Sequence, residues 1–238
     1  MLSRARRNVQ ILVLTLAILP AFACGTVVIP TTLALEDPSI INITIPIGPP
    51  EEQLKTSSLV GGVETTITTE LGLLELIKVS LGKALPADIA IDDIRIAGTG
   101  FDILGLLFTG TLCVEPDPAL PGGGTAMINV LLGVAEFDIA LNTLIWVTDP
   151  SLGGVVGGPL PFGATIDEMV PLSIGDLLDL IGGGSGGLSL TQEISTTLPP
   201  DTPVIGPAEV SATLTLSSTD TFPSDPLLDE CEAFFASM

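Results

Sequence analysis

The 238-residue chain combines an apolar composition with a strong negative charge. Hydrophobic residues make up 46% of it, and 28 acidic residues against seven basic ones give a formal net charge of −21. Such a charge repels phosphate backbones and excludes nucleic acid as an expected partner. Disordered acidic chains are poor in aliphatic residues, so we expect this one to fold. The chain has no His, the usual general base and commonest metal ligand, so we expect neither an enzyme nor a cofactor.

The N-terminus has the pattern of an export signal. Arg4, Arg6 and Arg7 precede a nine-residue apolar run, ILVLTLAIL, which ends at Pro20. A transmembrane helix needs about 20 apolar residues, so this run is too short for a permanent membrane anchor. We therefore predict that residues 1–23 are a signal peptide that is removed on export. All three arginines leave with it, and the remaining chain has a formal charge of −24.

The signal ends in Ala23 and Cys24, which resemble the lipobox of bacterial lipoproteins. In that family the cysteine is diacylated and becomes the new N-terminus. The match is partial, because Ala21 stands where the family usually has Leu. The resemblance implies lipidation of Cys24, attachment to a membrane through that lipid and, with Gly25 next in the chain, an outer-membrane location in the cell envelope. The same residues also fit an A-x-A site for ordinary signal peptidase, which would give a secreted protein.

The pattern after the signal predicts one mainly β domain. Residues 24–38 contain Thr and Pro without hydrophobic periodicity, and we expect a short tether there. Residues 39–238 have the length of a single domain, and their short alternating runs predict an antiparallel β-sandwich or open barrel with two or three short helices. The first strand is expected over 39–47, where isoleucine recurs at every second position from 41. Pro46 places this strand at an edge or close to its own end.

The next third of the chain mixes strand and helix patterns. The Thr-rich residues 63–70 predict an exposed strand, and residues 71–81 favour a helix ending at Gly82, although a buried strand also fits them. Isoleucines at 89 and 91 alternate in one phase and those at 94 and 96 in the other. This change of phase predicts a β-bulge at Asp92–Asp93.

The middle of the chain predicts further strands. Residues 104–114 form an apolar run that ends near Cys113, and a Pro- and Gly-rich turn follows. Residues 125–147 hold a second long run, which we expect a hairpin to divide near Gly133 or Asn142–Thr143. Residues 149–163 are rich in glycine and proline and predict a loop or a bent edge.

The C-terminal part predicts two helices and two strands. Ser173 is expected to cap a helix over 173–181, and alternating strands follow over 187–198 and 209–217. Val210, Ala212, Leu214 and Leu216 are the inward set of the last strand. The final helix starts at the good N-cap Asp225.

Two cysteines remain if Cys24 is modified. Cys113 lies near a strand end and Cys231 on the apolar face of the last helix. In an oxidising compartment these two residues are expected to form a disulfide, and two separate buried thiols are the alternative.

Two motifs are decoys for catalysis. Residues 183–187 match G-x-S-x-G, but without His the serine has no triad partner, and we interpret the segment as a glycine linker. Asp92 and Asp93 are adjacent acids, but neighbouring strand residues point to opposite faces, and no acid spacing matches a calcium loop. We predict no catalytic, cofactor or metal residues.

The surplus of aliphatic residues leads to two functional hypotheses. Runs such as 104–114 and 128–132 are apolar on both faces, so they must pack on helices, line a cavity or meet a partner. The first hypothesis is a non-enzymatic envelope protein that binds an apolar ligand or lipid. The alternative is a structural or adhesive β-sandwich displayed at the surface.

Overall fold

The protein is described here by a computed structural model. It describes residues 25–46, 52–102, 109–149, 154–173, 175–176, 179, 187–197 and 209–238.

The fold is mainly β, as the sequence predicts. Nine antiparallel strands make one sheet: β1 (Gly25–Pro46), β2 (Glu52–Leu71), β3 (Leu85–Asp102), β4 (Thr109–Pro116), β5 (Gly123–Asn129), β6 (Val134–Asp149), β7 (Gly154–Pro171), β8 (Ser189–Thr197) and β9 (Glu209–Thr219). Two helices accompany them within the described residues: α2 (Leu73–Ser80) and α4 (Pro226–Phe235).

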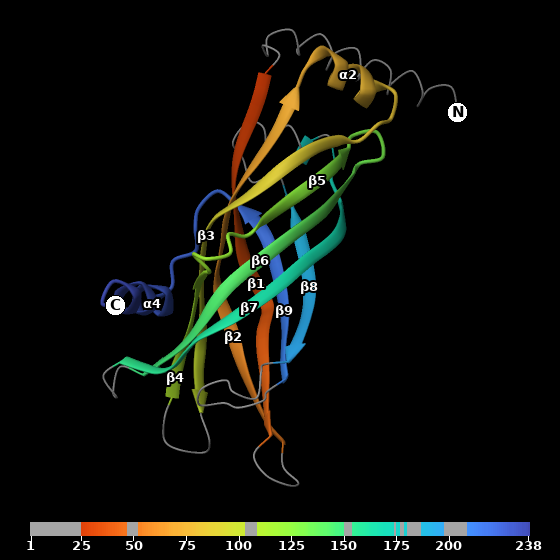
Figure 1. Cartoon of the computed structure of the whole chain (residues 1–238). Helices are drawn as coiled ribbons and strands as arrows, with labels where there is room; N and C mark the ends of the chain where they lie inside the picture. Colours follow the sequence, from red (N-terminus) through yellow and green to blue (C-terminus); the bar gives the residue numbers. More distant parts are fainter. Residues whose placement is uncertain are drawn as a thin grey trace.

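The sheet curves into a partial ring (Figure 1). Its order runs β8, β9, β1, β2, β3, after which β5 and β4 lie end to end between β3 and β6, and β7 follows β6. β7 lies against β8, but no ladder joins these two edges among the described residues. Of the two architectures left open by the sequence, the ring corresponds to the open barrel.

The interior of the ring is the main hydrophobic core, because each strand turns every second side chain inward. β9 shows the rule clearly: Val210, Ala212, Leu214 and Leu216 are buried, whereas the residues between them are partly or fully exposed. The predicted inward set is therefore confirmed. Aliphatic side chains from every strand form this core.

The expected tether is wrong for the residues that the structure describes. β1 begins at Gly25, and Ile29 and Leu33 are buried in the main core. A buried threonine, Thr31, occupies the inward position between them and hides the hydrophobic period. Pro30 is tolerated because β1 pairs only with β2 at that point; pairing with β9 starts at Thr32.

The bulge in β3 is confirmed. Glu64 of β2 pairs with Asp93 and Thr65 pairs with Ile91, which leaves Asp92 as the extra residue. β2 also runs unusually close to β3 at Gly61, whose φ of +117° and lack of a Cβ avoid a collision with the backbone carbonyl of Arg95.

The hairpin expected within residues 125–147 turns near Gly133, which is one of the two predicted positions. β5 and β6 are joined by residues 130–133, and Gly133 has a φ of +68°. β6 continues through Asn142–Thr143 to Asp149. Residues 149–163 were expected to form a loop or a bent edge, and from Gly154 onwards they belong to the edge strand β7, so the edge alternative is confirmed and the loop is wrong. β7 is an edge strand that pairs only with β6, so its prolines remove few ladder bonds.

The last helix follows its capping signal, whereas Gly72 at the N-cap of α2 makes no side-chain hydrogen bond. Residues 73–80 form α2, and Asp225 caps α4 by accepting a hydrogen bond from the backbone N–H of Leu227 at 2.9 Å. Ser173 Oγ accepts from the N–H of Asp176 at 3.1 Å, and the Asp176 carboxylate accepts from the N–H of Ser173 at 2.8 Å. Hydrogen bonds to the Asp176 carboxylate from the hydroxyl and the backbone N–H of Ser173 lower the pKa of Asp176. Within the described residues, no helix has both the length and the apolar character needed to cross a bilayer.

Candidate functional site

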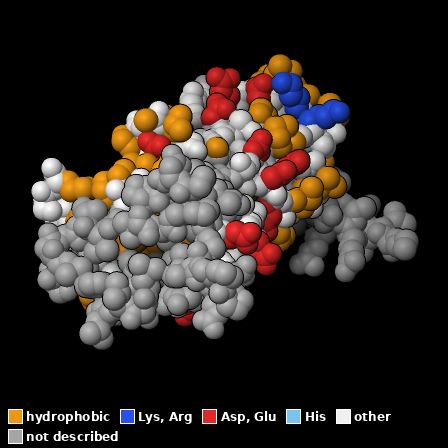
Figure 2. Space-filling view, turned by 60° about the horizontal axis from the view of Figure 1, so that its bottom comes forward, with side chains coloured by type: hydrophobic (Ala, Val, Ile, Leu, Met, Phe, Trp, Pro, Cys, Tyr) orange, Lys and Arg blue, Asp and Glu red, His pale blue; other side chains and the backbone are white. Residues whose placement is uncertain are grey.

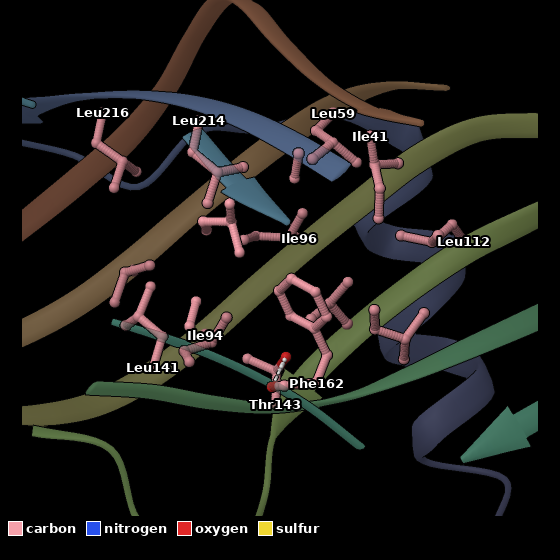
Figure 3. Close-up of a pocket in the computed structure, with 16 residues that line it drawn as sticks. Ile41, Leu59, Ile94, Ile96, Leu112, Leu141, Thr143, Phe162, Leu214 and Leu216 are labelled. Carbon is pink, nitrogen blue, oxygen red and sulfur yellow. Dashed lines mark hydrogen bonds between the residues drawn. The ribbon is translucent and has the colours of Figure 1, made fainter. Parts of the chain in front are cut away.

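The interior of the ring holds a small apolar cavity of about 50 Å³ (Figure 3). Side chains from eight of the nine strands line it, among them Ile94 and Ile96 of β3, Leu214 and Leu216 of β9 and Phe162 of β7. Figure 3 shows these side chains converging from opposite walls of the ring. Pockets for drug-sized ligands usually measure about 300–1,000 Å³, so this interior is nearly filled by its own side chains.

Thr143 is the single polar side chain in the lining of this cavity. Its hydroxyl donates a hydrogen bond to the backbone carbonyl of Phe162 at 3.0 Å, across the β6–β7 pair. The bond satisfies the hydroxyl inside the wall, so it leaves no polar group to orient a ligand.

The C-terminal helix packs on the outside of the ring. The structure contains the disulfide between Cys113 of β4 and Cys231 of α4, whose Cα atoms are 5.5 Å apart across 118 residues of sequence. Ala97 and Leu228 complete the buried part of this second, smaller core. In Figure 1, α4 lies beside β3 and β4, well away from α2. Cys231 thus faces the sheet, as its position on the apolar helix face predicts.

Arg95 of β3 joins the sheet to α4. Its guanidinium contacts Glu64 at 2.8 Å, Asp93 at 3.0 Å and Glu232 at 3.2 Å, and it lies 3.8 Å from the centre of the Phe222 ring. Burial lowers the pKa of Arg95, but the hydrogen bond to Glu232 and the three carboxylates raise it by more. Arg95 therefore remains charged and fastens the last helix to the wall of the ring.

The acids that invited a catalytic test are engaged in structural contacts. Asp92 accepts a hydrogen bond from the hydroxyl of Thr66 at 2.6 Å, and Asp93 pairs with Arg95. The indole N–H of Trp146 donates to Glu115 at 2.9 Å. Across the part of the chain that the structure describes, no group of three or more His, Cys, Asp or Glu could hold a metal ion.

The outer face of β8, β9 and β1 is hydroxyl-rich and acidic. Thr191 pairs with Thr215, Glu193 with Thr213, and Ser195 with Ser211 across the β8–β9 ladder. A side-chain hydrogen bond continues this surface from β9 to β1, where the hydroxyl of Ser217 donates to the carboxylate of Glu36 at 2.5 Å. Figure 2 shows acidic side chains spread over one face of the molecule, and the Lys and Arg side chains visible in that view lie at one corner.

One end of the ring exposes large apolar side chains. We call it the apolar end patch, and it comprises Leu73, Leu74, Ile77, Leu81, Leu131 and Leu132, which are between 47% and 74% exposed. No residue of α2 is buried, although Val79 packs partly against the main core. The sequence predicts the helix correctly, but its hydrophobic period does not reveal that these leucines face outward.

The structure describes some of the residues singled out from the sequence and not others. Cys113 and Cys231 meet, whereas Cys24 and residues 183–186 of the glycine motif lie outside the described residues. Arg95 and its partners were missed, because Glu232 is 137 residues away in the sequence. The only available signal was that Arg95 is the single arginine after the leader.

Comparison with protein-family models, with curated proteins and with solved structures finds no match to this chain.

Proposed function

We propose that this is an exported, non-enzymatic protein of the cell envelope, held at a membrane through Cys24 and acting as a structural or adhesive display domain. The nearly filled interior carries the proposal. A cavity of about 50 Å³ within an aliphatic wall suits a rigid scaffold better than a carrier of large ligands.

The polar outer face supports the display role. Ser, Thr and Glu side chains from neighbouring strands form a continuous hydrogen-bonding surface on a sheet whose other face is the main core. The charge of −24 after the leader keeps so apolar a chain soluble and prevents copies from associating indiscriminately. A surface of this kind suits polar partners.

The anchor is tested by metabolic labelling with a clickable palmitate analogue. We expect label on the wild-type protein in the membrane fraction, and none on Cys24→Ser. Recovery of an uncleaved chain from the cytosol, with Met1 attached, would remove the export proposal.

The display role is tested with the purified domain that starts at Gly25. Native mass spectrometry should show no co-purified lipid, and a fluorescent fatty acid should not bind. Light scattering should then detect association of the domain with isolated envelope material.

A second function, binding of an apolar ligand, is favoured by the seam between β7 and β8. Among the described residues the two edges adjoin without a ladder, which would let the ring open there towards its aliphatic interior. Fatty-acid binding that is abolished by a larger side chain at Ala212, which lines the cavity, would favour the carrier over the display domain.

A further inference from the structure

The first described residue lies next to the apolar end patch. Gly25 pairs with Leu71 across β1 and β2, and α2 starts two residues later at Leu73. Cys24 is one peptide bond from Gly25. Whatever holds Cys24 at a membrane therefore holds this end of the ring at the same membrane, with no flexible spacer between them.

Two separate segments build the patch. Leu73, Leu74, Ile77 and Leu81 come from α2 and its C-terminal end, and Leu131 and Leu132 from the β5–β6 turn. The side-chain amide of Asn129 donates to the carbonyl of Gly82 at 3.3 Å, and a Cβ at Gly82 would lie 3.7 Å from Leu131 Cδ1. The two segments are thus in contact, and their exposed leucines form one surface.

The charges around the patch favour a lipid bilayer over a second copy of the chain. Only four basic residues follow Cys24, and two of them, Lys78 and Lys83, belong to this end, where Lys78 lies 3.5 Å from the carboxylate of Glu75. Exposed apolar residues with flanking lysines are typical of helices that lie in a membrane interface. Two copies would instead bring together chains that each carry a charge of −24.

We propose that the apolar end patch is a membrane-seating surface: α2 and the β5–β6 turn enter the lipid interface beside the N-terminal anchor and hold the ring upright. The inference rests on the N-terminal anchoring proposed above. In Figure 1, α2 and the start of β1 share one end, and the long strands run away from it. The hydroxyl-rich face then stands clear of the membrane.

The test replaces the proposed lipid on Cys24 with a lipid that is attached chemically. The chain starting at Cys24 is coupled through its thiol to maleimide lipid in phosphatidylcholine vesicles, while Cys113 and Cys231 remain oxidised. Hydrogen–deuterium exchange is compared before and after coupling. We expect about tenfold slower exchange in peptides covering residues 72–84 and 129–134, with no change in residues 226–236.

Leu74→Glu and Leu120→Glu form a matched pair, because both leucines are 59% exposed and both changes add one negative charge. Leu74→Glu should abolish the protection of residues 72–84, and Leu120→Glu should leave it intact. Equal protection in both variants, or none in the wild type, overturns the proposal. Slow exchange of residues 72–84 in a dimer before vesicles are added would assign the patch to a second copy of the chain. Slow exchange in the full 238-residue chain without vesicles would assign it to residues 1–23. Either result overturns the proposal.

This outcome is separable from the labelling of Cys24 in cells. Failure of metabolic labelling would remove the lipid anchor on Cys24 and with it the premise of the seating proposal, whereas protection in vesicles would still show that the patch contacts lipid. Lack of protection in vesicles would remove the seating surface alone.

Discussion

Ser39 of β1 accepts a hydrogen bond from the backbone N–H of Thr215 in β9 at 3.0 Å, across 176 residues of sequence. Its hydroxyl also donates to the carbonyl of Glu36 at 2.6 Å, and the side chain is almost fully buried. The register of β1 shifts between Glu36 and Ile40, so Ser39 supplies the hydrogen bonds that the interrupted ladder lacks.

Replacing Ser39 with Ala should therefore destabilise the fold. The change leaves a buried N–H and a carbonyl without a partner, which costs about 1–3 kcal/mol. The free energy of unfolding from urea denaturation measures the loss. Ser195→Ala, on the exposed face of β8, is the control and should change stability by less than about 0.5 kcal/mol. Equal effects would contradict the role given to Ser39.

The Cys113–Cys231 disulfide should add substantially to stability. Closing 118 residues of sequence restricts the unfolded chain by up to about 5 kcal/mol in the entropic model, and measured values are often lower. A reductant should lower the urea midpoint of the wild type. It should leave the Cys113→Ala/Cys231→Ala double variant unchanged, and a reductant effect on that variant would point to another cause.

Arg95 and Glu232 should show a positive coupling energy. Their contact is partly exposed, so the interaction is screened, and we expect a coupling of about 0.5–1 kcal/mol in a double-mutant cycle of Arg95→Gln and Glu232→Gln. Arg95→Gln alone should cost about 1–2 kcal/mol, because Glu64, Asp93 and Phe222 lose the same partner. Lys83→Gln removes an equal charge from an exposed residue and should have little effect.

The cavity predicts opposite effects of two changes in its lining. Ala212→Val adds volume beside a void of about 50 Å³ and should raise the free energy of unfolding by about 0.5–1 kcal/mol. Ile94→Ala enlarges the void and should cost about 2–5 kcal/mol. Destabilisation by Ala212→Val would mean that the wall is more tightly packed than the cavity implies.

Added salt should stabilise the protein. Residues 24–238 carry a formal charge of −24, and self-repulsion opposes the compact state. Raising the ionic strength from about 0.01 to 0.15 M shortens the Debye length from about 30 to 8 Å and should increase the thermal midpoint. A midpoint that falls over this range would mean that ion pairs such as Arg95–Glu64 outweigh the repulsion.

The sequence was most informative where side-chain period and burial coincide. In β9 every second residue is apolar, and around Asp92 the shift of phase located the bulge. The pattern failed in β1, where Thr31 occupies an inward position, and for β7 it left both a loop and a bent edge open, because prolines suit a loop and are also tolerated in an edge strand. In both strands, pairing partners rather than local composition decide whether such residues extend.

Of the candidate sites, the cysteine pair could be predicted from the sequence, whereas the exposed face of α2 and the contacts of Arg95 could not. The cysteine pair was predicted from the count and from an expected oxidising compartment, because Cys113 and Cys231 are the two cysteines beyond residue 24. The exposure of α2 could not be found from its sequence, since an apolar helix face has the same period whether a sheet or lipid covers it. The contacts of Arg95 depend on chain segments that only the folded ring brings together.

β4 and β5 lie end to end in the sheet, so the wall of the ring is interrupted at the turn between them. Together the two strands occupy a single strand position between β3 and β6. The turn that connects them is held by Asp117, which accepts hydrogen bonds from the backbone N–H groups of Ala119 and Leu120. Residues 118–121 are exposed and belong to no strand. The turn is thus the natural place to splice in a peptide tag or a guest domain, because extra length there leaves every other strand in register.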